Sequence, residues 1–302
     1  MPEAIIRVKH LSHIYKAAPF PKKALNDISL EIVQGDCVAI IGFNGSGKST
    51  LVQHLNGLLR PTQGSIWVDG IDIGVKNIDL RALRQRVGML FQFPESQLFG
   101  RTVYTDVAFG PQRMKLGRHE IRTRVKGALN IVGLPHEEYG WRSPFELSGG
   151  QRRRVALAGI LAMSPRILIL DEPTVGLDGE GRSEFYSYLQ HIQREQGVTI
   201  ILVSHDMAEV AAMADWLYIL HQGNLVQQGT PRTIFAESGQ LHAWDLAVPP
   251  LHALLEELRQ LGIAVSKDLL TVDEAFTFLQ KWKLESSFRI AYSEAEADHP
   301  RR

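Results

Sequence analysis

Short apolar runs separated by polar turns recur along the first part of the chain. The runs that are rich in β-branched residues predict strands at 4–8, 28–32, 37–41, 65–69 and 87–91. From about residue 95 to 160 the apolar spacing becomes helical, as in 120–134, which predicts a helical insert. Strand patterns return at 166–170, 199–205 and 216–229, the last as a hairpin around Gly223. Strands alternating with helices predict a largely parallel α/β sheet.

The segment after about residue 236 has a different pattern. One helix face collects the leucines at 251, 254, 255, 258 and 261. Thr271 and Glu274 have the spacing of a capping box, which predicts a second helix that would bury Phe276, Leu279 and Trp282. Two short helices make a poor core alone, so we expect them to pack on the main domain or on a partner.

Composition and charge narrow the class of protein. The 302 residues are 44% hydrophobic, and 33 basic residues balance 33 acidic ones, so no global charge favours a nucleic-acid partner. The one cysteine, Cys37, is expected to be a core thiol. No secretory leader and no apolar run of about 20 residues is present, so we expect a cytoplasmic chain that a partner would hold at a membrane.

The stretch 40–50, IIGFNGSGKST, contains the P-loop pattern Gly42-x-x-x-x-Gly47-Lys48-Ser49. Its glycines allow tight turns and close approach of the backbone to a ligand. Amides of the loop and the start of the next helix favour phosphate, Lys48 can reach the β- and γ-phosphates, and Ser49 offers a hydroxyl to Mg²⁺. An apolar strand before the loop and helical leucine spacing after it supply the expected context.

Two further stretches extend this chemistry. The run ILILDE ends a predicted strand with Asp171, which would hold Mg²⁺, and with Glu172, which could orient or deprotonate an attacking water. LSGGQ, residues 147–151, opens a predicted helix and gives a second anion-binding helix end. Two such ends suggest that they serve different faces of one ligand.

Together these motifs resemble an ABC-type ATPase over about residues 3–237. Gly42–Ser49 matches Walker A, Gln92 the Q-loop, LSGGQ the signature, ILILDE Walker B, Asp178 the D-loop and His205 the switch histidine. Tyr15 stands where the family has an aromatic residue that stacks on adenine. The resemblance implies that ATP lies between two such domains, so a monomer would have little or no activity.

Residue roles follow from the same resemblance. The nucleotide set is Tyr15, Gly42, Asn44, Gly45, Ser46, Gly47, Lys48, Ser49 and Thr50, and Mg²⁺ would be held by Ser49, Gln92 and Asp171. The catalytic set is Glu172 as general base with His205 and Gln92. Leu147, Ser148, Gly149, Gly150 and Gln151 would close the partner's site in trans, and Asp178 would couple the two sites.

The stretches 91–111 and 143–178 are similar to energy-coupling factor (ECF) transporter ATPases, and more to the second than to the first of their two ATPases. This resemblance implies a related ATPase partner, with a homodimer as the alternative, a transmembrane T-component, exchangeable substrate-binding S-components and no nucleic acid. The substrate would be a vitamin or a transition-metal ion, and the chain would be peripheral on the cytoplasmic face of the membrane. Residues 94–99 would border the groove for the T-component's coupling helices, with Glu95 pairing a helix arginine.

The expected fold is therefore a P-loop α/β core with a mixed sheet and flanking helices, a helical subdomain and a small C-terminal helical extension. The predicted divisions are 1–94 with 160–237 for the core, 95–159 for the subdomain, 238–290 for a dimerisation extension and 291–302 for a disordered tail. The alternatives are the ATPase of a conventional homodimeric transporter, a soluble ABC ATPase and a nucleotide-gated scaffold without turnover. Glu172 and His205 argue against the scaffold, and the single P-loop and neutral charge argue against the soluble protein.

Two weaker signals carry expectations as well. Arg152, Arg153 and Arg154 open a helix against its dipole, and we expect one or two to face an interface or nucleotide and the rest to be solvated. His10, His13, His54 and His119 show no metal-ligand spacing and are expected on the surface.

Overall fold

The computed structural model describes residues 3–16, 21–266 and 269–283. Contacts within the chain divide it into two compact units, one of residues up to 205 together with 213–229, the other of 206–212 and the residues from 230 onward. The predicted tail at 291–302 lies outside the described residues, as does the end of the predicted extension.

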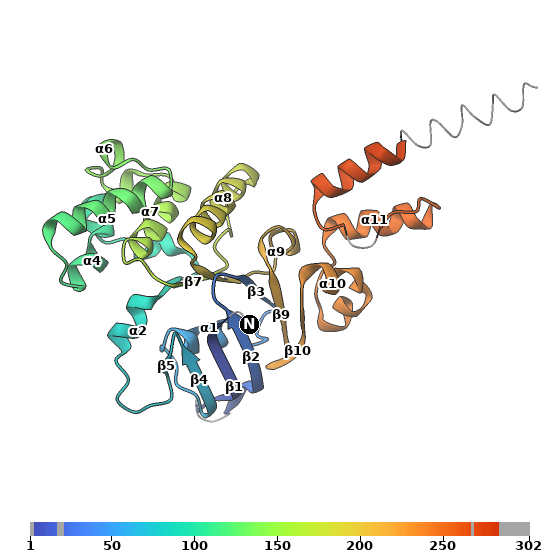
Figure 1. Ribbon diagram of the computed structural model, residues 1–302, viewed down its shortest axis with the longest axis horizontal. Helices are drawn as coiled ribbons and strands as arrows, with labels where there is room; N and C mark the ends of the chain where they lie inside the picture. The colour runs from blue at the N-terminus through green and yellow to red at the C-terminus, as the bar shows by residue number, and fades with distance from the viewer. Residues whose placement is uncertain (1–2, 17–20, 267–268, 284–302) are drawn as a thin grey trace, which may run out of the picture. The chain divides into compact units, whose positions relative to one another are not determined.

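The first unit is built on two sheets (Figure 1). The smaller is antiparallel, in the order β2-β1-β4-β5, with β1 Ala4–Tyr15, β2 Lys22–Val33, β4 Gln63–Val68 and β5 Ile71–Asp72. The larger has the order β10-β9-β3-β8-β7-β6, with β3 Cys37–Ile41, β6 Val87–Leu90, β7 Ile167–Asp171, β8 Thr199–Val203, β9 Trp216–His221 and β10 Asn224–Gly229. Its strands are parallel except for β10, which pairs antiparallel with β9 as the predicted hairpin. The predicted mixed sheet with flanking helices is confirmed.

Helices cover both faces of the larger sheet. The remaining elements of this unit are α1 Lys48–Leu55, α2 Leu80–Arg86, η1 Pro94–Gln97, α3 Val103–Val107, α4 Phe109–Arg113, α5 Arg118–Ile131, α6 His136–Tyr139, η2 Pro144–Glu146, α7 Gly149–Leu161 and α8 Gly179–Gln196. Figure 1 shows α4 to α8 beside β7, on the side away from β1, β2 and β4. The stretch 95–160 is therefore helical, as its apolar spacing predicts.

Alternate residues of the parallel strands enter two separate cores. In β7, Leu168 and Leu170 pack with the helical layer, whereas Ile167 and Ile169 pack with α1 and the antiparallel sheet. Both faces of each strand are thus buried, which is why these strands appear in the sequence as continuous apolar runs instead of alternating ones.

The second unit is helical, and Leu255, Val265 and Ala275 form a small apolar cluster in its C-terminal part. Its elements are α9 Met207–Met213, α10 Pro231–Ala236, η3 Ser238–Trp244, α11 Pro250–Gln260 and a helix at 272–283. The last residue of α9, Met213, belongs to the first unit. The predicted capping box is present, because the Glu274 amide donates to Thr271 Oγ1 at 3.2 Å and the Thr271 amide to Glu274 Oε2 at 3.3 Å.

The predicted buried face of the last helix is wrong. Phe276 is 60% exposed and Trp282 38%, whereas Ala275 and Phe278 pack against Leu255 of α11. A capping box indicates where a helix begins but not which of its sides is buried. The positions of the aromatic residues therefore did not predict the buried face.

Arg153 fastens α7 to the segment that follows β7. Its guanidinium donates from Nη1 to the carbonyls of Pro173 and Val175, both at 2.8 Å, and lies 3.5 Å from Glu95. The residue is only 5% exposed, so the expectation that the arginines at 152–154 are divided between an interface and solvent misses its structural role. Its spacing of four to the buried Leu157 was the available signal, since both lie on one helix face.

Two histidines expected on the surface are buried. His54 on α1 is 0% exposed and His13 on β1 is 8% exposed, whereas His10 and His119 are exposed as expected. Burial lowers the pKa of His54 to about 4, against the opposing effect of hydrogen bonds to the backbone of Thr50 and Arg60. His54 is therefore neutral in the folded protein at physiological pH.

The buried His54 predicts an acid-sensitive contribution to stability. The unfolded chain binds a proton near pH 6.5 and the folded chain only near pH 4, so stability falls as pH drops through that window. At 1.36 kcal/mol per pKa unit the loss approaches about 3 kcal/mol. In urea unfolding between pH 7 and pH 4, the free energy of unfolding should decline less steeply with falling pH for His54→Gln than for the wild type. Parallel pH curves for the two proteins would contradict this assignment.

Replacing Arg153 tests whether its hydrogen bonds between α7 and the segment after β7 stabilise the fold. Arg153→Met leaves one buried and one partly buried carbonyl without a donor, and we expect a loss of about 2–4 kcal/mol in the free energy of unfolding. The matched control, Arg122→Met on the exposed side of α5, should stay within about 0.5 kcal/mol of the wild type. Equal effects at the two positions in denaturant titrations would show that the buried hydrogen bonds do not stabilise the fold.

Candidate active site

The candidate residues come from adjacent strands of the larger sheet. In the order β3-β8-β7-β6, the P-loop follows β3, His205 follows β8, Asp171 ends β7 and Gln92 follows β6. Because parallel strands end at the same edge, these four groups share one edge although they are far apart in the sequence.

The loop after β3 leaves no room for side chains at two of its glycines. Gly42 and Gly47 have φ of 156° and 108°. A Cβ on Gly47 would lie 2.7 Å from the carbonyl oxygen of Ala24, and one on Gly42 would overlap the carbonyl oxygen of Leu220. The exposed backbone amides of such a loop, followed by the start of α1, are suited to bind phosphate.

Lys48 lies across this loop. Its Nζ donates to the carbonyls of Gly42 at 2.7 Å and Phe43 at 3.1 Å, and the residue is 6% exposed. Burial lowers the lysine pKa, while the charges of Glu172 and Asp171 oppose that shift. The lysine charge is thus desolvated beside two carboxylates, where it favours an anionic ligand.

Ser49 and Asp171 meet through a side-chain hydrogen bond. Burial raises the pKa of Asp171, and the bond from Ser49 opposes the rise. A hydroxyl and a carboxylate fit Mg²⁺, which is held in proteins by one or two carboxylates together with substrate phosphates. Ser46 Oγ of the same loop is buried without a hydrogen-bond partner, so a further polar group faces the loop interior. The residues present therefore fit a magnesium–nucleotide ligand.

The backbone of Glu172, the residue after β7, departs from the strand conformation. Its φ is 50°, a left-handed conformation uncommon for a residue with a side chain, and its amide donates to Val203 O at 2.9 Å. The carboxylate lies 3.3 Å from Gln92 Nε2 and 3.1 Å from His205 Nδ1. The three residues of the expected catalytic set are therefore in mutual contact through Glu172.

Tyr15 lies at the end of β1, next to the helix that follows the P-loop. Its side chain is 37% exposed, and its hydroxyl is 3.2 Å from Thr50 Oγ1. Asn44 and Gly45 are exposed at the tip of the loop. The loop, Thr50 and the tyrosine thus border one solvent-accessible region.

The signature caps a different helix. Ser148 Oγ accepts from the Gln151 amide at 3.2 Å, and the Ser148 amide donates to Gln151 Oε1 at 3.0 Å, which forms a capping box at the start of α7. Leu147 is buried, Gly149 exposed and Gly150 partly exposed. No hydrogen bond among the described residues joins the signature to the P-loop. Asp178 caps α8 by accepting from the Gly181 amide at 2.8 Å.

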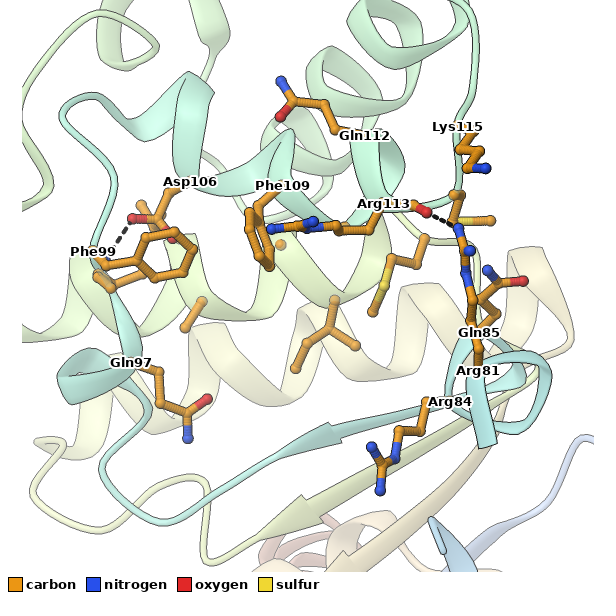
Figure 2. Close-up of a pocket in the computed structure, with 18 of the residues that line it drawn as sticks. Arg81, Arg84, Gln85, Gln97, Phe99, Asp106, Phe109, Gln112, Arg113 and Lys115 are labelled. Atoms are coloured by element: carbon orange, nitrogen blue, oxygen red, sulfur yellow. Dashed lines mark hydrogen bonds between the residues drawn. The ribbon is translucent and has the colours of Figure 1, made fainter. Parts of the chain in front are cut away.

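A groove of about 870 Å³ begins a few residues beyond Gln92 (Figure 2). Phe99 and Phe109 meet edge to face at 4.9 Å, and the guanidinium of Arg113 lies 5.0 Å from the Phe109 ring centre. The sequence motifs indicate only its border at 94–99 and give no signal for its aromatic and basic residues from α2 and α4. Its lining includes Arg81, Arg84, Gln97, Phe99, Asp106, Phe109, Arg113, Lys115, Ile160 and Met163.

The basic side chains of the groove outnumber its acidic ones. Asp106 is its one carboxylate, and it accepts hydrogen bonds from the amides of Phe99 at 3.0 Å and Gly100 at 2.6 Å. Four lining residues are basic, namely Arg81, Arg84, Arg113 and Lys115. The groove therefore combines an apolar floor with a positively charged rim.

Among the described residues, no helix is both long and apolar enough to cross a membrane.

Comparison with known proteins agrees with this geometry. A model of the ABC transporter family matches residues 25–175. The energy-coupling factor transporter ATP-binding protein EcfA2 of Symbiobacterium thermophilum is 53% identical over 266 residues, which cover 88% of this chain and 92% of that protein.

Two solved structures share the fold. The structure of cbiO1 from Clostridium perfringens, described as part of the ABC transporter complex cbiONQ, has a TM-score of 0.72 and 41% identity and covers 84% of this chain and 99% of that one. A dimeric ATP-binding cassette in a post-hydrolysis state with ADP and Pi has a TM-score of 0.67 and 29% identity and covers 75% and 99%. The chain belongs to the ABC transporter ATPases and, within them, to the ATP-binding proteins of energy-coupling factor transporters.

Proposed function

We propose that this chain binds and hydrolyses ATP with Mg²⁺ to energise uptake of a vitamin or a transition-metal ion through a transmembrane T-component. Exchangeable S-components in the membrane would bind the substrate, and the chain would lie on the cytoplasmic face as a peripheral subunit. The observation that carries the proposal is the basic, aromatic groove, because its lining includes Gln97, a few residues along the chain from the glutamine that contacts Glu172. A membrane partner seated there would be one short segment from the hydrolysis site.

The loop after β3 would bind the phosphates of the nucleotide. Lys48 and the backbone amides of residues 42–50 would bind the β- and γ-phosphates, and Tyr15 would stack on adenine. Ser49, Asp171 and Gln92 would hold Mg²⁺, which neutralises phosphate charge when bound. The Ser49–Asp171 hydrogen bond supports the first two ligands, whereas Gln92 donates to Glu172 in this structure.

Glu172 would act as the general base. An attacking water between its carboxylate and the γ-phosphate would lose a proton to the carboxylate, with His205 supporting the carboxylate and the γ-phosphate. Its left-handed backbone directs the carboxylate to Gln92 and His205, which is the observation in support.

The active form would be a dimer. Leu147–Gln151 would close the site of a second, related ATPase, with Asp178 coupling the two sites, and a homodimer remains the alternative partner arrangement. Support comes from the absence of hydrogen bonds between signature and P-loop among the described residues and from the dimeric relative with ADP and Pi. In the C-terminal unit, Leu254, Leu261, Val272 and Phe276 are each at least 49% exposed, which suits a second contact between ATPases.

The groove would receive a cytoplasmic helix of the T-component. Its aromatic floor fits an apolar helix face, and its basic rim favours acidic residues at the ends of that helix (Figure 2). The expected pairing of Glu95 with a partner arginine is weakened, because Glu95 already lies 3.5 Å from the buried Arg153.

The proposal is tested by a tagged pull-down from native membranes in mild detergent, with partners identified by mass spectrometry. A second ATPase, one T-component and several small membrane proteins would support the ECF assignment, and the small proteins would identify the substrates. A single dedicated permease would instead indicate a conventional transporter, and the absence of membrane partners would contradict a transport role.

Glu172→Gln should bind ATP but hydrolyse it at least about 100-fold more slowly, because the amide cannot accept the proton from water. Turnover by the purified complex and retention of radiolabelled ATP after gel filtration measure the two properties. Wild-type turnover by this variant would assign the base to another residue.

Phe109→Asp should reduce recovery of the membrane partner by about tenfold, because it places a charge on the apolar floor of the groove. ATP binding to the isolated chain should not change. The matched control is Val75→Asp, an exposed position outside the groove that is 51% accessible, which should leave recovery unaffected. If both variants assemble normally, the groove is not the docking site.

A further inference from the structure

A closed ring of contacts joins β1 to helix α1 behind the P-loop. The rings of Tyr15 and His13 meet edge to face with centres 4.6 Å apart, and His13 Nδ1 lies 3.1 Å from His54 Nε2. His54 Nδ1 is 2.7 Å from the Thr50 carbonyl, and Thr50 Oγ1 is 3.2 Å from the Tyr15 hydroxyl. The chain of contacts therefore returns to the residue from which it starts.

The direction of each hydrogen bond follows from the chemistry of the groups. A carbonyl only accepts, so His54 Nδ1 carries the proton that is donated to Thr50. In the tautomer that donates Nδ1–H to Thr50, Nε2 is an acceptor to which His13 Nδ1–H can donate, and the backbone of Arg60 lies beside the same ring as a further partner. His54 is neutral, because burial holds its pKa near 4, and a single tautomer of each ring then satisfies the pair.

We propose that the His13–His54 pair is a positioning element of the nucleotide site, which holds the Tyr15 ring against α1 in the orientation required to stack on adenine. The inference rests on the proposed role of Tyr15. Phosphates bound at Lys48 and Ser49 and a base stacked on Tyr15 belong to one ligand, so the two elements must keep a fixed separation. The buried histidines provide this link, and the exposed Tyr15 hydroxyl contributes a second attachment to Thr50.

The test separates the base from the phosphates of the ligand. Calorimetry on the full chain compares Mg-ADP, which carries the base, with Mg-tripolyphosphate, which does not. His54→Leu and His13→Phe each remove a hydrogen bond of the pair and should weaken ADP binding by about 3- to 10-fold, with tripolyphosphate binding unchanged. His13→Asn keeps a donor close to the position of Nδ1 and should recover part of the ADP affinity. The matched control is His10→Asn, an exposed histidine of the same strand, which should behave as wild type.

Tyr15→Ala distinguishes failure of this inference from failure of the proposed nucleotide site. If Tyr15→Ala leaves ADP affinity unchanged, the tyrosine is not the adenine platform. That result would contradict both the stacking role of Tyr15 and the positioning role of the histidine pair. If Tyr15→Ala weakens ADP binding and the histidine variants do not, only the positioning role is wrong. Equal weakening of ADP and tripolyphosphate in the histidine variants would also overturn it, because that pattern indicates damage to the P-loop. In a Tyr15→Ala background, His13→Phe should have no further effect on ADP binding.

Discussion

The parallel pairing of β3, β8, β7 and β6 is the constraint on which the rest of the site depends. Each strand ends in a group that the proposed chemistry uses, and the hydrogen-bond ladder places the four ends along one edge. Burial of both strand faces stabilises this ladder, because helices cover one side and α1 with the antiparallel sheet covers the other. The positions of Glu172, Gln92 and His205 are therefore set by strands whose two faces lie in the core.

Two sets of buried polar side chains, Arg153 and the His13–His54 pair, join further elements to this core. Arg153 joins α7, the helix that the signature opens, to the segment that follows Walker B. The His13–His54 pair joins the strand that carries Tyr15 to the helix that carries Lys48 and Ser49. Each link connects two elements that would bind the same nucleotide or its partner's nucleotide.

The groove and the hydrolysis site are neighbours for a topological reason. β6 ends at the edge of the sheet, so the chain that leaves it passes Gln92 and then enters the helical layer at Leu98 and Phe99. A partner bound in the groove would contact the same short segment that contacts Glu172. A membrane component bound in this groove would therefore lie within a few residues of the proposed hydrolysis site.

The local features of this protein could be predicted from its residues alone: the P-loop, the strand that ends in Asp171 with Glu172 after it, the capped signature helix and the change from strand to helical spacing near residue 95. These features depend on residues close together in the chain, and their physical causes act over a few positions. The fold established the strand order that brings Gln92 and His205 to Glu172, and the left-handed backbone of Glu172. It also decided that Arg153, His13 and His54 are buried and that Phe276 and Trp282 are exposed. Burial and pairing depend on which distant segments meet, and a charged or aromatic residue is chemically the same in the sequence whether a neighbour covers it or not.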